Sequence, residues 1–121
     1  MTADDLPPAW QRDERGVDAP NRRYIGFVHE SGRVRVYANE RRTDGGGYRV
    51  AVNAEGREGT VTIPLRIVSS LDRVTAIAVE FANLFDGAYG RSSDVEEATR
   101  YAADRVRPPD GLDPFVAEGP D

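Results

Sequence analysis

The sequence predicts an α+β domain, in which a four-stranded antiparallel meander sheet is followed by two α-helices packed on one face. Apolar and polar residues alternate between residues 24 and 63, which is the period of strands in a half-buried sheet. From Ser69 to Gly87 the apolar residues recur at steps of three and four, which is the period of a helix with one buried face. A chain of 121 residues is long enough for one such domain and too short for two.

Residues 1–21 are predicted to form an extended N-terminal arm. The segment is polar, contains Pro7, Pro8 and Pro20, and has Trp10 as its one aromatic side chain. A single tryptophan usually serves packing. We therefore expect Trp10 to anchor the arm on the edge of the domain in preference to binding a partner.

Four strands are expected between residues 24 and 63. The first two flank Ser31-Gly32, a two-residue turn that suits a tight hairpin. A glycine-rich loop over residues 43–47 and a turn over residues 55–59 separate the others. The predicted strands are Tyr24–Glu30, Arg33–Glu40, Tyr48–Ala54 and Thr60–Ile63.

Pro64 leaves two interpretations open. It can end the fourth strand at an edge of the sheet, or it can occupy the first turn of a helix that runs on into the apolar segment. We favour a strand that ends at Ile63, with irregular or short helical structure from there to Ser69.

Two helices are expected after Pro64. Ser69 or Ser70 can cap the first, Asp72 suits its positive end, and Gly87 and Gly90 end it. The expected buried side chains of this helix are Leu71, Val74, Ile77, Ala78, Phe81, Leu84 and Phe85. The second helix runs from a capping box that begins at Ser93 to about Arg107, before two prolines. Its expected buried side chains are Val95, Ala98, Ala102 and Val106.

The charges divide the chain into three parts. Residues 1–21 hold two arginines against five acids, residues 22–73 hold ten against six, and residues 74–121 hold four against ten. The domain is predicted to span residues 22–107, followed by a disordered acidic tail at 108–121. All 16 basic residues are arginine and the formal net charge is -5, a composition that resembles proteins of extreme halophiles. In such proteins an acidic surface mainly keeps the chain soluble, so the net charge does not exclude an anionic partner.

The sequence predicts neither catalysis nor a cofactor or metal. There is no cysteine, and His29 is the only histidine, which we expect at the surface. The loop Asp44–Gly47 lacks the Lys-Ser/Thr of a phosphate-binding loop and joins two strands, so a flexible hairpin loop is expected. The N-terminal residues are unlike a signal peptide, and no run of about 20 apolar residues occurs. A cytoplasmic protein without a membrane partner is therefore expected.

One face of the predicted sheet carries the candidate site. Arginine pairs well with phosphate, and tyrosine can stack on a base. This segment is also the part of the chain with net charge +4. The candidate nucleic-acid-binding residues are Arg33, Arg35, Tyr37, Asn39, Arg49 and Asn53, with Arg22, Arg23, Arg41 and Arg42 at the strand ends. The alternative is an ordinary solvated face, in which arginine is the only cation that this chain uses.

Two functions therefore stay open. The first is a small non-catalytic protein that binds nucleic acid through this face, with single strands favoured over duplexes. The second is an interaction module that forms a homodimer or docks a protein partner, because the apolar residues of the first helix span more than one stripe.

The order of elements from Tyr24 to Phe85, four antiparallel strands and a long helix, resembles a family of transcriptional coactivators that bind single-stranded DNA. The resemblance implies a dimer that grips nucleic acid through its sheets. It is one of architecture and transfers no motif, and the second helix departs from the family's pattern.

Overall fold

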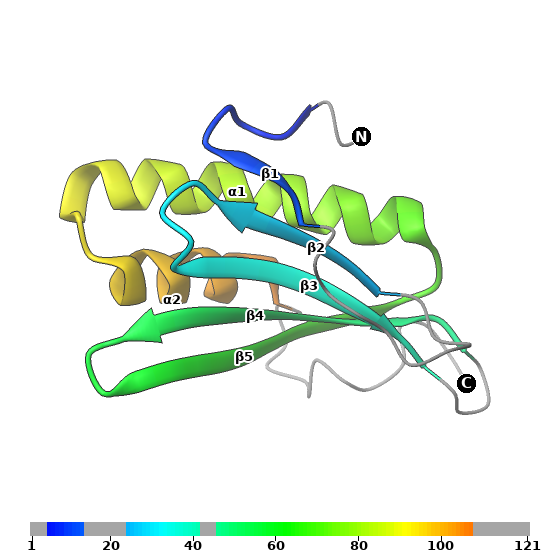
Figure 1. Ribbon diagram of the computed structural model, residues 1–121. Helices are drawn as coiled ribbons and strands as arrows, with labels where there is room; N and C mark the ends of the chain where they lie inside the picture. The colour runs from blue at the N-terminus through cyan, green and yellow to red at the C-terminus, as the bar shows by residue number, and fades with distance from the viewer. Residues whose placement is uncertain (1–4, 14–23, 42–45, 108–121) are drawn as a thin grey trace.

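A computed structural model of the chain describes residues 5–13, 24–41 and 46–107. These residues form two layers, a sheet and a pair of helices behind it in the view of Figure 1. The strands are β1 (Trp10–Asp13), β2 (Tyr24–His29), β3 (Val34–Glu40), β4 (Tyr48–Gly56) and β5 (Gly59–Val68). The helices are α1 (Leu71–Ser92) and α2 (Val95–Val106). The predicted α+β class, with an antiparallel sheet followed by two helices, is confirmed.

The sheet has five strands, so the predicted count of four is wrong. All neighbours are antiparallel and follow chain order, β1 to β5. The additional strand, β1, pairs with β2, with Trp10 opposite His29. It is short, and its centre is Gln11-Arg12, so only Trp10 carries the apolar signal of a strand. Residues of the predicted arm thus belong to the sheet, whereas the predicted tail lies outside the described residues.

The turns and the ends of strands differ in detail from the prediction. The β2–β3 turn spans four residues, Glu30 to Arg33, closed by the Gly32 N–H, which donates to the His29 carbonyl at 2.8 Å. Gly32 has φ +73°, a conformation that favours glycine. β4 continues through the predicted turn to Gly56, so the β4–β5 turn is only Arg57-Glu58. The predicted loop residues 43–45 lie outside the described residues.

Pro64 neither ends a strand nor begins a helix, because β5 continues through it to Val68. Pro64 pairs with Ala51, while Val50 pairs with Arg66, so the register shifts by one residue here. β5 is an edge strand. A proline without an N–H and a bulge are both tolerated at the edge of a sheet, which is why the strand does not stop at Ile63.

The helix ends follow capping chemistry. Ser70 caps α1, where its hydroxyl accepts from the Arg73 N–H at 3.3 Å. α1 runs through both glycines, which were expected to end it, and its last residue is Ser92. Ser93 adopts φ +57° there, and Asp94, not Ser93, caps α2 by accepting from the Glu97 N–H at 3.0 Å. The cap of α2 is therefore displaced by one residue from the prediction, and the Asp94 N–H donates to the Ser92 hydroxyl at 3.2 Å, where a capping box would have it donate to Glu97.

The core lies between the sheet and the helices. Alternate residues of β2 to β5 face α1, whose Phe81 and Phe85 are fully buried. α2 packs beside α1 and presents small side chains, among them Ala98 and Ala102, both fully buried. α2 thus covers the part of α1 that the sheet leaves open. Neither helix of the described part of the chain is long and apolar enough to cross a membrane.

Thr99 of α2 gives a stability prediction. It is 1% exposed, and its hydroxyl has no hydrogen-bond partner within the described residues. Thr99→Val keeps the shape and removes the unsatisfied group, so we expect the free energy of unfolding to rise by about 1 kcal/mol. Urea denaturation measures the change. Thr62→Val is the control and should give no gain, because the Thr62 hydroxyl donates to Asn53 at 2.7 Å. A Thr99→Val variant that is less stable than the parent would contradict the conclusion that the Thr99 hydroxyl is unsatisfied.

Candidate nucleic-acid interface

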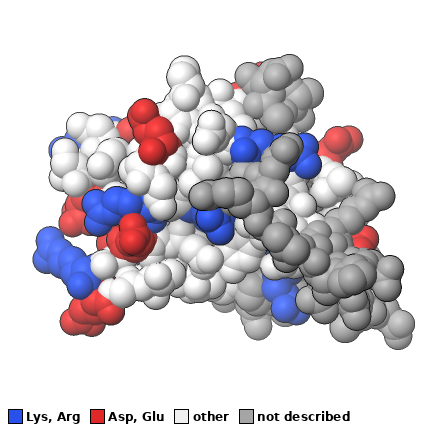
Figure 2. Space-filling model, viewed as in Figure 1, with Lys and Arg blue, Asp and Glu red and all other residues white. Residues whose placement is uncertain are grey.

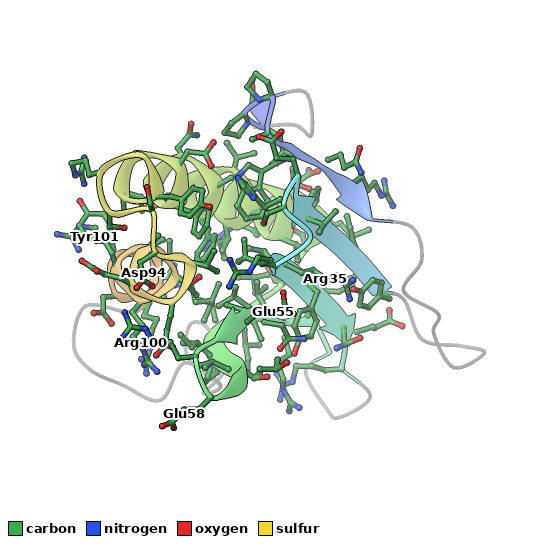
Figure 3. All side chains as sticks on the ribbon, turned by 60° about the vertical axis from the view of Figure 1, so that its left-hand side comes forward. Arg35, Glu55, Glu58, Asp94, Arg100 and Tyr101 are labelled. Atoms are coloured by element: carbon green, nitrogen blue, oxygen red, sulfur yellow. The ribbon has the colours of Figure 1, made fainter. Side chains whose placement is uncertain are left out.

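The predicted site residues come together on the face of the sheet that points away from the helices, which we call the outer face. The β3–β4 register pairs Arg35 with Asn53 and Asn39 with Arg49, and places Tyr37 between them opposite Ala51. Paired residues share a face of the sheet. The intervening Val36 and Val52 are fully buried beneath the helices. Figure 3 shows Arg35 on the side of the sheet away from both helices.

Tyr24 belongs to the same face and was missing from the prediction. In the β2–β3 pair it lies opposite Asn39, while Gly26 lies opposite Tyr37. The rings of Tyr24 and Tyr37 stack with centroids 6.2 Å apart and planes 19° apart. The outer face therefore carries a pair of aromatic rings. The alternation that placed Tyr37 on this face also applies to Tyr24, once the hairpin register is known.

The half-buried side chain of Tyr37 keeps its proton, and so stays uncharged, up to alkaline pH. Burial raises the pKa of its hydroxyl above 10.0, an effect that the nearby positive charge of Arg35 partly opposes. A raised folded pKa contributes stability that is present below pH 10 and is lost as pH rises through the folded value. At neutral pH the ring consequently brings no negative charge to a face that is otherwise basic.

Arg33 differs from the other predicted arginines. It precedes β3, in the turn, and its Nε lies 3.6 Å from Glu55 Oε2. Both side chains are more than half exposed, so the pair contributes little to stability. Glu55 nevertheless offsets the charge that Arg33 would offer a phosphate. A shallow hollow of about 200 Å³ lies here, with Arg35 and Asn53 also in its wall.

The charge on the outer face is carried mainly by two strands. Arg35 is half-buried on β3 and Arg49 is exposed on β4. In the space-filling view of Figure 2, basic groups form separate patches on a mostly uncharged surface, and acidic groups lie both at its margins and beside some of the basic patches. Arg41, predicted at the end of the face, donates instead from Nη1 to the Gly46 carbonyl at 3.3 Å. Arg22, Arg23 and Arg42 lie outside the described residues.

His29 is buried, so the expectation of a surface histidine is wrong. It is 6% exposed, and its ring contacts Trp10, Phe85 and Tyr89 edge-on. In β2 it has the same parity as Ile25 and Phe27, which face the core. The alternation from Tyr24 onward already indicates this parity, which the expectation of a surface histidine did not take into account.

Ser31, His29 and Asp86 are arranged in the order of a catalytic triad. His29 Nδ1 lies 2.9 Å from the Ser31 hydroxyl, and His29 Nε2 lies 4.0 Å from Asp86 Oδ1. However, the N–H of Ser31 donates to Nδ1, that of Gly32 to the His29 carbonyl and that of Arg33 to the Ser31 hydroxyl. An oxyanion needs such donors pointing outward. All three are used within the turn, so the group stabilises the hairpin.

A second polar cluster joins the β4–β5 turn to the start of α2. The Arg57 N–H donates to Glu96 Oε1 at 3.3 Å, and the Arg57 side chain pairs with Asp94 at 3.4 Å. Arg100 pairs with Glu96, 3.3 Å away. Figure 3 shows Asp94 and Arg100 on the helix side, with Glu58 at the tip of the turn. Because its opposite charges are paired, the cluster is best explained as a clamp between the layers, although it borders a hollow of about 430 Å³.

The carboxylate of Asp94 is stabilised in its charged form. Its pKa lies below the ordinary value of 3.8, first because the Glu97 N–H bonds its carboxylate and further because Arg57 is near. A helix cap explains this shift. Within the described ranges, no three His, Asp or Glu side chains converge as metal ligands would.

Comparison with known proteins gives no relative. A scan against protein-family models, a search of curated proteins and a search of solved structures each find no significant match to this chain. The resemblance to the single-strand-binding coactivators therefore stays an expectation, and function has to be argued from the residues themselves.

Proposed function

We propose that the protein is a small non-catalytic binding protein whose outer face takes single-stranded nucleic acid. One observation carries the proposal: the stacked rings of Tyr24 and Tyr37 lie among Arg35, Asn39 and Arg49 on one face of the sheet. Stacking of bases on aromatic rings combined with phosphate contacts by arginine is how proteins hold single strands without reading their sequence.

The spacing of the groups supports this arrangement. Arg35 and Asn39 are four residues apart on β3, which is about 13 Å along a strand. Arg49 lies beside Asn39 on β4, so one arginine stands at each end of this distance, with the Tyr37 ring between. A strand of nucleic acid that crosses the face diagonally can place phosphates at both ends and bases over the rings.

The shape of the face favours a single strand over a duplex. The rings lie on a sheet and can stack only on bases that are not already stacked and paired. A duplex is read by an element that enters a groove, such as a helix or a two-stranded ribbon. The described helices lie on the opposite side of the sheet and do not reach the outer face (Figure 1).

Salt dependence tests the charge part of the proposal. Each arginine contact to a single strand contributes roughly 0.7 to the slope of log affinity against log salt. With Arg35 and Arg49 as the two contacts, we expect a slope of about -1.4 for a fluorescein-labelled oligothymidine, measured by anisotropy from moderate to high salt. Arg35→Ala or Arg49→Ala should halve it. The matched control is Arg91→Ala on α1, which should leave the slope unchanged.

Stacking is tested separately. Tyr37→Ala should weaken binding by about 1 to 3 kcal/mol and leave the salt slope nearly unchanged. Circular dichroism must show every variant folded under the assay conditions. If the folded parent binds neither single nor double strands, or if Arg35→Ala and Tyr37→Ala both bind as well as the parent, the nucleic-acid function is rejected. The alternative, a protein partner or a homodimer, is then examined by light scattering across a protein concentration series.

A further inference from the structure

Gly26 occupies an unusual place in the middle of β2. Glycine weakens a strand, and one inside a strand often marks a close approach. Here the close approach is the Tyr24 ring: a Cβ on Gly26 would lie 2.8 Å from the Tyr24 hydroxyl oxygen and 3.1 and 3.2 Å from two ring carbons. The tyrosine therefore lies across the glycine two residues ahead of it, along the strand.

This position of the ring is what brings it beside Tyr37. Gly26 is the partner of Tyr37 in the β2–β3 register. The space above Gly26 is consequently the site next to the Tyr37 ring, and Tyr24 fills it, with the two ring planes 19° apart. A side chain at residue 26 would push the Tyr24 ring out of this space and leave Tyr37 alone.

We propose that Gly26 is a positioning residue that holds Tyr24 beside Tyr37, so that the outer face takes two neighbouring bases of a single strand. The inference rests on the proposed function and adds the chemical class of the ligand, a strand with two consecutive unpaired bases. Covering a glycine with an aromatic ring also stabilises a sheet. The experiment must therefore separate binding from stability.

The experiment compares two oligothymidines of equal length in the anisotropy assay, one intact and one with an abasic site at every second position. Both keep all phosphates, and only the first offers neighbouring bases. The parent should prefer the intact strand by about 5- to 150-fold, the effect of one stacked base. Gly26→Ala should bind the abasic strand as the parent does and lose most of this preference.

A double variant tests whether Gly26 acts through the Tyr24 ring, because a purely structural role of Gly26 would not make the binding preference depend on the Tyr24 hydroxyl. The Tyr24 hydroxyl is the nearest obstacle to a new Cβ. Adding Tyr24→Phe to Gly26→Ala should therefore restore part of the preference that Gly26→Ala lost. Gly90→Ala on α1 is the matched control, because a Cβ there meets nothing within 4 Å, and it should keep the preference in full.

The outcomes separate this inference from the proposed function. If the parent binds neither strand, the proposed function fails and the inference with it. If the parent binds both strands equally, or if Gly26→Ala keeps the preference, the inference is overturned while binding through Arg35 and Tyr37 stands. Should Gly26→Ala not fold, Tyr24→Ala replaces it and must lose the preference; a retained preference overturns the inference.

Discussion

Phe81→Ala is expected to lower the free energy of unfolding by about 3 to 5 kcal/mol, which is a large part of the stability of a small domain. Phe81 is fully buried at the centre of α1, with the rings of Trp10 and Phe85 6.2 and 6.3 Å away. These neighbours belong to different elements and cannot all close on the cavity that the lost ring leaves. Urea denaturation followed by circular dichroism measures the change, at a salt concentration that keeps the parent folded.

Glu80→Ala is the control for Phe81→Ala. It is the adjacent residue of the same helix but exposed, so its replacement should change the unfolding free energy by no more than about 0.5 kcal/mol. A Phe81→Ala variant that unfolds at the urea concentration of the parent would place the ring outside the core, and the packing of α1 on the sheet would have to be abandoned.

Trp10→Ala is expected to have an effect of similar size, about 3 to 5 kcal/mol, with a local component. Trp10 is 5% exposed, contacts Phe81 and Phe85 edge-on and donates from Nε1 to Asp86 Oδ1 at 2.8 Å. Its loss removes the one large side chain that fastens β1. Hydrogen exchange should consequently rise most at the amides that pair β1 with β2, and less in β4 and β5.

Trp10→Phe separates packing from the hydrogen bond. It keeps a ring against Phe81 and Phe85 but loses the donor to Asp86 and part of the indole's packing, so we expect a smaller loss than for Trp10→Ala, roughly 1.5 to 3 kcal/mol. Because Trp10 is the only tryptophan, its emission in the parent reports on the docking of β1. Uniform exchange across all five strands in Trp10→Ala would show that β1 does not open as a separate unit.

The fold was largely predictable because periodicity is a property of the chain. The period of two located the strands from Tyr24 onward, and the period of three to four located both helices. β1 was missed because four residues give too short a pattern, and its burial depends on α1, 76 residues away at the Trp10–Asp86 hydrogen bond. The prediction for Pro64 was wrong because the backbone preference of proline is the same at the end of a strand and within a strand at the edge of a sheet.

The candidate site was predictable to the extent that strand parity defines it. Arg35, Tyr37 and Asn39 share a face on any register, and the observed register places Arg49 opposite Asn39 and Asn53 opposite Arg35. The role of Glu55 beside Arg33 could not be foreseen, because β4 extends two residues beyond its predicted end. The stacking of Tyr24 on Tyr37 could not be predicted from alternation. It depends on the Tyr24 ring lying over Gly26, which is the partner of Tyr37 on the neighbouring strand.

The two edges of the sheet differ in what they offer another copy of the chain. Along β5 the register shift and Pro64 interrupt the regular run of backbone donors, so a foreign strand finds no continuous ladder there. At the other side, β1 is the last strand of the described sheet and is only four residues long. Two copies that pair through β1 about a twofold axis form a closed dimer, because each copy then uses its one suitable edge. Within the described sheet, the two edges therefore disfavour end-to-end growth of copies into a fibre.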